Sequence, residues 1–323
     1  MRHARITGTG RSVAPVLLTN ADMEVRFGAG VADWLKKNTG IEQRFHMAPG
    51  QVTSDLAAEA GTQALARARV RAEDVDLVIV ATDTPDQLSP ATAAVVQFKL
   101  GATKSGVLDV NSACSGFVTA MDLAAKALVA DETISHVLVI GAYGMSRYID
   151  WADKSTATLF ADGAGAVVLS ASNKRGYLGG TLWADGSKWA SLGIYQGGTA
   201  QPAGGDVRPT VKFVAKFPKT YNTEHWPRML RETSKKTGVP MEDVKLFVFT
   251  QLNLRTIEDV MQTIGQPMTK THWVMNKWGY TGSGCIPMTL DDAIEQERLA
   301  PGDIVAFCAS GGGVSMASAF VEI

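Results

Sequence analysis

Short apolar runs alternate with longer amphipathic stretches along most of the chain. Apolar runs within 72–82, 106–110 and 136–146 are rich in Val, Ile and Leu. Runs of this length predict buried strands, whereas the stretch 54–70 has the length and composition of a helix. This alternation predicts an α/β fold in which helices cover mostly parallel sheets.

The second half of the chain repeats this pattern at an offset of 169 residues. Segment 72–82, AEDVDLVIVAT, matches segment 241–251, MEDVKLFVFTQ. Four identities fall at this single offset: Glu73 with Glu242, Asp74 with Asp243, Val75 with Val244, and Leu77 with Leu246. A helical stretch precedes each segment and ends at the same repeat position, Val70 and Val239. A duplication explains this match better than chance does.

The same order of elements continues beyond these segments. Segment 106–124 predicts a strand, a tight turn and a helix, and segment 272–293 predicts the same series. We therefore expect two halves of similar plan, residues 1–170 and 171–323. The glycine-rich segment 176–222 is predicted to form turns and short strands, as an insertion rather than a separate domain.

The composition excludes several classes of protein. The chain has 323 residues, of which 46% are apolar and 20% charged, and its net charge is -1. A charge near zero gives no general attraction to nucleic acid or anionic lipid. No uninterrupted apolar run approaches the roughly 18 residues of a membrane-spanning helix. Residues 1–13 predict a short strand and a glycine turn instead of a secretory signal.

The cysteines and histidines favour neither disulfides nor a metal site. Cys114, Cys285 and Cys308 show no CxxC spacing, and the five histidines form no ligand-like cluster. Few, scattered cysteines are typical of a reducing compartment. We therefore expect a cytoplasmic protein without a bound metal.

One cysteine occupies a position that favours reactivity. In the stretch DVNSACSGF, residues 109–117, Cys114 lies between small residues where a predicted strand meets a predicted helix. The partial positive charge of a helix N-terminus stabilises a thiolate and lowers its pKa. Free N–H groups at the same place can stabilise an oxyanion. A buried, unreactive cysteine in a tight strand–helix junction is the alternative interpretation.

Five stretches together resemble one enzyme family over nearly the whole chain. They are NTGIEQRF (38–45), ATDTPDQLSPATAAVVQFKLG (81–101), DVNSACSGF (109–117), LFADGAGAVVL (159–169) and APGDIVAFCASGGGVSMASAFV (300–321). The chain resembles the thiolase-fold condensing enzymes, and most of all β-ketoacyl-acyl-carrier-protein synthase III. The resemblance implies a thiolase-like fold, with two duplicated halves in five α-β-α-β-α layers. It also implies that Cys114 accepts an acyl group, with an N–H near Gly312 completing the oxyanion hole.

The chain departs from the family at two site positions. Where the family carries His in a motif like HQANLR, this chain has Thr250; where it carries Asn in GNT, this chain has Tyr280. The resemblance implies that the missing pair stabilises the enolate formed on decarboxylation. Loss of such a donor typically costs about 10²–10³ in rate. Thr250 and Tyr280 can donate hydrogen bonds, but neither is a base near neutral pH.

The resemblance also assigns a site for the thioester donor. It implies that Trp34 stacks on adenine, that Lys154 stands where the family usually has Arg, and that Asn253 and Arg255 belong to the motif near the phosphates. Asn38 stands where many members carry another Arg. Replacement of Arg by Lys removes bidentate phosphate contact, which favours a carrier-protein or small thioester donor over free coenzyme A. Alternatively, Trp34, Lys154 and Arg255 are ordinary surface residues.

We expect an acyltransferase that works through an acyl-Cys114 thioester in fatty-acid-like or polyketide-type biosynthesis. The expected donor is acyl-CoA or a phosphopantetheinyl acyl-carrier protein, the acceptor is a small molecule, and no cofactor is tightly bound. The resemblance further implies a homodimer in which residues 84–95 line the partner's pocket. The alternatives are a C–C condensing synthase and an inactive partner subunit of a synthase.

Overall fold

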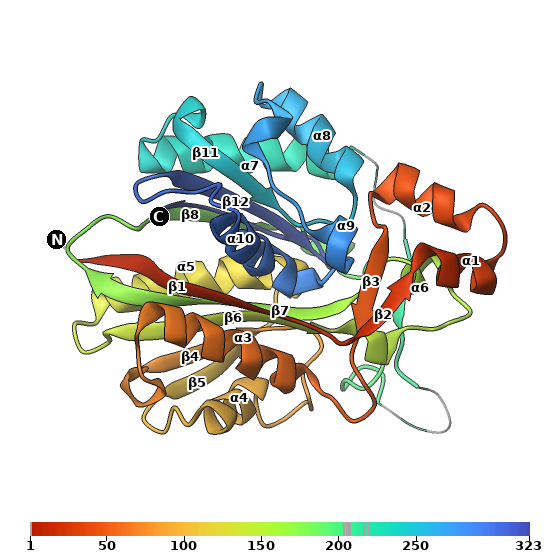
Figure 1. Cartoon of the computed structure of the whole chain (residues 1–323), viewed down its shortest axis with the longest axis horizontal. Helices are drawn as coiled ribbons and strands as arrows, with labels where there is room; N and C mark the ends of the chain where they lie inside the picture. Colours follow the sequence, from red (N-terminus) through yellow and green to blue (C-terminus); the bar gives the residue numbers. More distant parts are fainter. Residues whose placement is uncertain (1, 203, 205–207, 216–217, 219) are drawn as a thin grey trace.

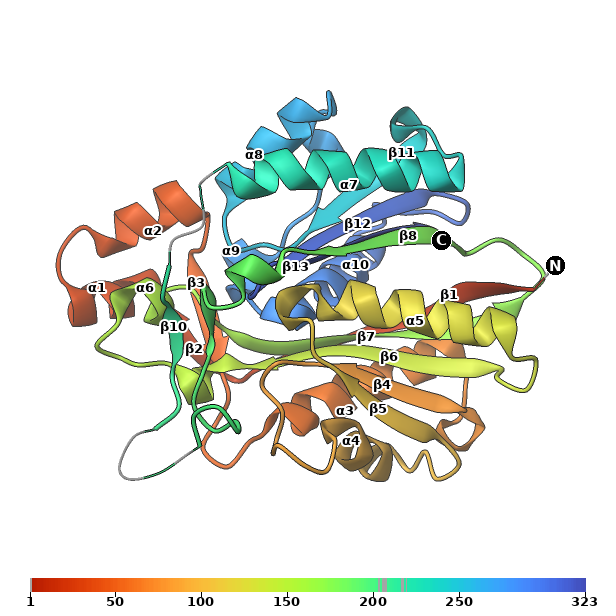
Figure 2. The same cartoon turned by 180° about the vertical axis from the view of Figure 1, so that it is seen from behind.

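The computed structural model describes residues 2–323 except 203, 205–207, 216–217 and 219. Its elements form five layers, in which two sheets are separated by α5 and α10 (Figure 1). Helices α3 and α4 cover the outer face of one sheet, and α7 and α8 cover the outer face of the other, as both views show (Figure 2). The thiolase-like fold with duplicated halves is therefore confirmed.

The two sheets combine parallel and antiparallel pairs. The first has the order β1-β7-β6-β4-β5 and the second the order β11-β12-β13-β8. The strands of the first sheet are β1 His3–Val13, β4 Leu77–Ala81, β5 Gly106–Val110, β6 His136–Gly144 and β7 Asp162–Ser172. Those of the second sheet are β8 Tyr177–Ala184, β11 Val244–Phe249, β12 Ile304–Gly311 and β13 Ser315–Glu322. Pairs β4–β5, β4–β6 and β11–β12 are parallel and the other pairs antiparallel, so the prediction of mostly parallel sheets is wrong.

The helices and two small strand pairs complete the fold. The helices are α1 Asn20–Phe27, α2 Val31–Thr39, α3 Thr53–Ala68, α4 Thr92–Leu100, α5 Gly116–Ala130, α6 Lys154–Ala157, α7 Tyr221–Thr237, α8 Leu254–Thr263, α9 Met275–Trp278 and α10 Cys285–Glu295. Strand β2 (Val16–Thr19) pairs with β3 (Gln43–His46), and β9 (Leu192–Ile194) pairs with β10 (Val211–Phe213). The predicted helices at 54–70 and 223–239 correspond to α3 and α7.

Equivalent elements of the two halves keep the offset of 169 residues. Helix α3 ends at Ala68 and α7 at Thr237, and α5 begins at Gly116 and α10 at Cys285. The 3-10 turns before α5 and α10, Ala113–Ser115 and Gly282–Gly284, have the same offset. Both turns open with a residue at φ 47°, Ala113 and Gly282. The exact division at residues 170 and 171 stays a prediction.

Three local predictions are wrong. Residues His3–Val13 form one long strand, β1, where the sequence predicts a short strand and a turn. Its glycines are required by packing, since a Cβ at Gly10 would lie 2.4 Å from the Ala60 carbonyl oxygen of α3. Segment 177–184 is β8, an edge strand of the second sheet and not part of an insertion. Segment 271–280 contains α9 and an isolated bridge from Thr271 to β11 in place of a strand.

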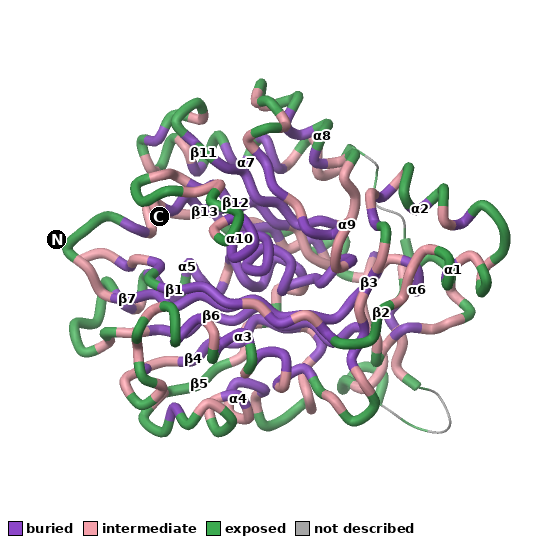
Figure 3. Tube along the Cα trace, in the orientation of Figure 1, coloured by how far each residue is buried: buried purple, intermediate pink, exposed green. Residues whose placement is uncertain are grey.

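The core lies around the two central helices. Figure 3 shows buried positions along both sheets and along α5 and α10. Residues Ala113–Ala130 reach the length and the mean hydropathy, 1.4, of a membrane-crossing helix, and 61% of them are buried. Asp122 and Lys126 interrupt this stretch, so it is not the uninterrupted apolar run whose absence the sequence predicts. Because this helix is enclosed between the sheets, its apolar character is that of a core helix (Figure 1).

Candidate active site

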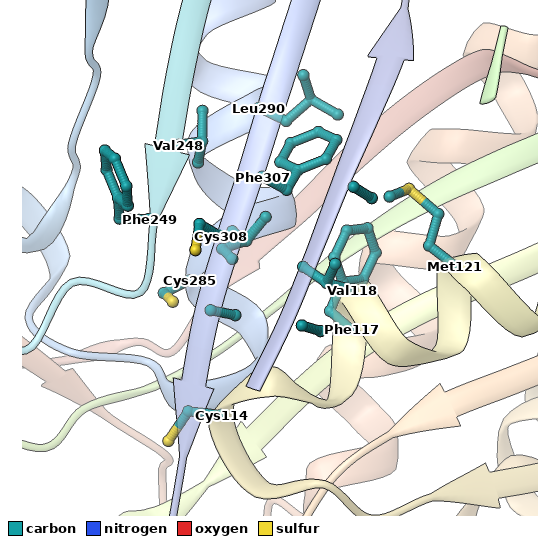
Figure 4. Close-up of a cluster of buried hydrophobic side chains, with 14 of the residues drawn as sticks. Cys114, Phe117, Val118, Met121, Val248, Phe249, Cys285, Leu290, Phe307 and Cys308 are labelled. Atoms are coloured by element: carbon teal, nitrogen blue, oxygen red, sulfur yellow. The ribbon is translucent and has the colours of Figure 1, made fainter. Parts of the chain in front are cut away.

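Cys114 lies in a strained turn between β5 and α5. The Ala113 N–H donates to Asn111 Oδ1 at 3.2 Å, and the Ser115 hydroxyl donates to the Ser112 carbonyl at 2.7 Å. Ala113 has φ 47°, a left-handed conformation that costs roughly 1–2 kcal/mol for a non-glycine residue. This turn places Cys114 at the start of α5, as predicted. Figure 4 shows it at the edge of a buried cluster that includes Cys285 and Cys308.

The C-terminal glycine loop packs directly on this turn. A Cβ at Gly311 would lie 2.5 Å from the Ser112 carbonyl oxygen and 2.9 Å from the Cys114 nitrogen. Only glycine allows the two backbones to approach this closely. The next residue, Gly312, lines the same cavities as Cys114. The structure therefore brings the predicted nucleophile and the predicted oxyanion loop together.

Two cavities meet at Cys114, although the residue itself is only 5% exposed. The first, here called the Tyr280 cavity, has a volume of about 330 Å³ and is also lined by Thr250, Asn253, Tyr280 and Gly312. The second, here called the Asp83 cavity, has a volume of about 220 Å³. Its lining includes Asp83, Asn111, Tyr143, Tyr195 and Gly312. The thiol is therefore not sealed in the core.

Thr250 follows the last residue of β11 and faces the neighbouring strand β12. Its N–H donates to the Cys308 carbonyl at 3.2 Å, and its hydroxyl oxygen accepts from the Ser310 N–H at 3.3 Å. The side chain is buried and lines the Tyr280 cavity together with Cys114. Its hydroxyl hydrogen can donate into the site, but the hydroxyl provides no general base near neutral pH.

Tyr280 contacts the nucleophile directly. Backbone bonds on both sides, to Leu159 and Ala161, fix its position, and its ring centroid lies 5.9 Å from that of Phe160. Its phenol is hydrogen-bonded to the side chain of Cys114. Burial raises the pKa of this phenol well above its ordinary value, and the nearby Cys114 adds to the rise. The phenol therefore acts here as a hydrogen-bond donor and not as a base.

Burial raises the pKa of the Cys114 thiol well above its ordinary value. The negative charge of Asp83 adds to this rise, whereas the hydrogen bond from Tyr280 opposes it. The expected lowering of this pKa by the helix N-terminus is therefore wrong. Removal of the thiol from water outweighs the field of the helix end, because an ion loses far more hydration than a partial charge restores.

The predicted donor-binding residues divide into two groups. Asn253 lines the Tyr280 cavity, but its Oδ1 caps α8 by accepting from the Arg255 N–H at 2.8 Å. Trp34 on α2, Lys154 on α6 and Arg255 on α8 are exposed and line neither cavity. Helices α2 and α8 do approach each other, since a Cβ at Gly40 would lie 3.0 Å from the Leu254 Cβ. The roles of Trp34, Lys154, Asn253 and Arg255 in donor binding stay predictions.

Asp83, which no motif in the sequence singles out, lines its cavity beside Cys114. It lies two residues beyond β4, and the carboxyl ends of the parallel strands β4 and β5 meet at the same edge. An acidic residue two positions after a buried apolar run was the available signal. Conversely, His272 lines neither cavity, and its ring lies between Asp292 at 2.7 Å and Arg298 at 2.9 Å.

Among the described residues, no group of three or more His, Cys, Asp or Glu side chains could hold a metal ion.

Comparisons with known proteins agree along the whole chain. Residues 108–186 match the family 3-oxoacyl-[acyl-carrier-protein (ACP)] synthase III, and residues 234–323 match the C-terminal part of the same family. A β-ketoacyl-acyl-carrier-protein synthase III of Xanthomonas campestris pv. campestris is 37% identical, over 99% of this chain and 98% of that protein. The corresponding enzyme of Roseiflexus castenholzii is 36% identical over the same shares.

Solved structures give the same result. The 3-oxoacyl-acyl-carrier-protein synthase III of Aquifex aeolicus VF5 superposes with a TM-score of 0.90 and 30% identity, over 99% of this chain and 100% of that chain. The priming β-ketosynthase of the R1128 polyketide biosynthetic pathway gives a TM-score of 0.92 and 27% identity, over 100% and 96%.

Proposed function

Because the chain belongs to the 3-oxoacyl-acyl-carrier-protein synthase III family, we propose that it is an acyltransferase that works through Cys114. It takes an acyl group from a thioester of coenzyme A or an acyl-carrier protein and passes it to a small-molecule acceptor. The observation that carries the proposal is the place of Cys114, at the meeting point of two cavities and under the glycine loop. The proposed setting is fatty-acid-like or polyketide-type biosynthesis in the cytoplasm.

The first step is a thiol–thioester exchange. Sγ of Cys114 attacks the carbonyl carbon of the donor, a new C–S bond forms, and the bond to the carrier sulfur breaks. The thiol proton of Cys114 ends on the departing carrier thiol. We assign stabilisation of the intermediate oxyanion to the N–H groups of Cys114 and Gly312, since the glycine loop contacts the nucleophile turn.

The second step releases the acyl group to the acceptor. A lone pair of the acceptor attacks the carbonyl of acyl-Cys114, the C–S bond breaks, and the acceptor's proton passes to Sγ. Tyr280 supports both steps, because its hydrogen bond to Cys114 stabilises negative charge on the sulfur when it attacks and when it leaves. No cofactor enters this sequence.

The environment of Thr250 and Tyr280 favours transfer over decarboxylative condensation. Tyr280 is buried beside Cys114 and its ring fills part of the cavity, while the oxygen of Thr250 already accepts a bond from Ser310. Neither side chain supplies a base near neutral pH. The alternative is C–C condensation, with Thr250 and Tyr280 as hydrogen-bond donors to an enolate, because the relatives are named as β-ketoacyl synthases. We also propose the homodimer of the family, with residues 84–95 at the partner's pocket.

Intact-protein mass spectrometry with a panel of acyl-CoA and acyl-pantetheine thioesters tests the proposal. We expect a mass gain of one acyl group in the parent protein and none in Cys114→Ala. Cys308→Ala is the matched control, because Cys308 is buried in β12 and lines neither cavity. No mass gain with any donor would contradict the proposal and favour an inactive subunit. Rapid CO₂ release from a malonyl thioester by the parent would favour condensation instead.

A further inference from the structure

The Asp83 cavity carries an acidic group that acyl transfer as proposed does not use. Ala81, the last residue of β4, pairs with Val110, the last residue of β5, and the Thr82 N–H donates to the Val110 carbonyl at 3.1 Å. This pairing brings Asp83 next to the turn that carries Cys114. Both residues line the one cavity.

Two polar groups in this cavity have no partner. Asp83 Oδ1 and Tyr195 Oη are buried, and neither makes a hydrogen bond within the described part of the chain. Both residues line the Asp83 cavity. A buried polar group that lacks a partner is costly, and a charged one more so, and such groups in native proteins usually await a water, an ion or a ligand.

The charge of the cavity is also unbalanced. Its described lining contains Asp83 but no Lys, Arg or His, and its other side chains with polar atoms are Asn111, Trp189 and the tyrosines 143 and 195. Burial raises the pKa of Asp83 to about 6, so the carboxyl is still largely ionised at neutral pH. The cavity therefore offers an anionic acceptor that no cation of its described lining balances, and no O–H or N–H group of that lining bonds to Asp83 Oδ1.

We propose that the acyl group carried on Cys114 bears a hydrogen-bond donor, a hydroxyl or an ammonium group, which pairs with Asp83 in this cavity. The inference rests on the proposed acyl loading of Cys114 and specifies the class of acyl group. The remainder of the lining, which includes Met145, Phe160 and Leu192, suits a short carbon chain. At about 30 Å³ for each non-hydrogen atom, 220 Å³ holds roughly seven such atoms.

The proposal predicts a preference that a purely apolar acyl pocket does not have. An alkyl chain of the same shape leaves Asp83 buried and unpaired, whereas a chain with a donor satisfies it. Sites built to hydrogen-bond a substrate group discriminate strongly against analogues that lack the group. We therefore expect donors with a hydroxyl or an amino group to load at least about tenfold faster than their methyl counterparts.

The test uses pantetheine thioesters in which carbon 3, 4 or 5 carries a hydroxyl, an amino group or a methyl group. The rate of acyl-Cys114 formation is followed by intact mass for the parent, Asp83→Asn and Asp76→Asn. We expect the polar-to-methyl rate ratio to be at least tenfold in the parent and to collapse in Asp83→Asn. Asp76→Asn removes the same charge at the opposite end of β4, and Asp76 lies outside residues 84–95 and lines neither cavity, so this variant keeps the ratio.

The outcomes separate the two claims. Faster loading of the hydroxyl series or of the amino series identifies which donor Asp83 accepts. Equal loading of all three series by the parent, or the same loss of preference in Asp76→Asn and Asp83→Asn, overturns the assignment of Asp83. Absence of loading with every donor overturns the acyl transfer itself, and with it this inference.

Discussion

The hydrogen bond from Tyr280 to Cys114 makes a specific contribution to nucleophilicity that Tyr280→Phe removes. Phenylalanine keeps the ring that packs 5.9 Å from Phe160 and 6.5 Å from Tyr143, so the change deletes little besides the phenol oxygen. A hydrogen bond to a charged group contributes about 1.5–3 kcal/mol. Burial already raises the pKa of Cys114. At about 1.36 kcal/mol per pKa unit, loss of this hydrogen bond raises it by about one to two further pKa units.

The effect on rate is smaller than the effect on ionisation. A rise of this size lowers the thiolate fraction about 10- to 100-fold at a fixed pH, but a more basic thiolate is also more nucleophilic, with a Brønsted slope of about 0.4–0.5. The net loss in loading rate is therefore about 3- to 10-fold. Acylation reactions run at pH 8 and quenched at set times, with acyl-Cys114 quantified by intact mass, measure this loading rate.

Tyr148→Phe is the control for this experiment, since it deletes the same oxygen from a tyrosine that lines neither cavity. It should load at the rate of the parent. If Tyr280→Phe remains folded and loads as fast as the parent, or if both variants slow equally, the phenol does not stabilise the sulfur and the reasoning fails.

Restoring the family pair with Thr250→His and Tyr280→Asn should raise CO₂ release from a malonyl thioester by at least about tenfold, since each such donor is typically worth 10²–10³; an unchanged rate in the double variant contradicts the account of the two losses. Burial raises the pKa of Asp83 to about 6, so the native state binds more protons than the unfolded state between about pH 4 and 6 and is destabilised above that window. Asp83→Asn should therefore increase the free energy of unfolding by about 3 kcal/mol at pH 7.5 and hardly at pH 4, as urea titrations at both pH values can show. Asp291 is buried and paired with arginines of β1 and α3, so Asp291→Ala should lower the free energy of unfolding by about 3 kcal/mol, and a loss below 1 kcal/mol speaks against a structural role for the pairs. Gly311→Ala places a Cβ 2.5 Å from a backbone oxygen of the nucleophile turn and should slow loading about 10²-fold in the mass assay while the protein stays folded.

The sequence was sufficient to predict the duplicated plan, because strand and helix patterns are local and the 169-residue offset preserves them. It was also sufficient to bring Cys114, Thr250, Tyr280 and Gly312 to one site, through motifs whose order matches the family. It misassigned β8, since half-buried edge strands rich in glycine lack a continuous apolar run.

Properties that depend on burial were out of reach. The raised pKa of Cys114 follows from side chains that close over it from both halves, and no local pattern reports their approach. The same holds for Asp83, whose unpartnered oxygen is known only once the cavity is formed. The strand prediction for segment 271–280 is wrong for a related reason. After Thr271 bridges to β11, α9 takes the place of the strand that the first half forms at β5.

The turn at Cys114 and its counterpart at Ser283, 169 residues later, each press against a glycine in the opposite half. Gly311 of β12 admits the Ser112 oxygen, and Gly141 of β6 admits the Ser283 oxygen, where a Cβ would lie 2.2 Å away. The Ser283 hydroxyl donates to the Ala142 carbonyl at 2.8 Å. The turn at Ser283 thus only holds the two halves together, whereas the equivalent turn at Cys114 also carries the thiol. If the chain were cleaved between its two halves, neither fragment would contain a complete active site until the two fragments reassociated.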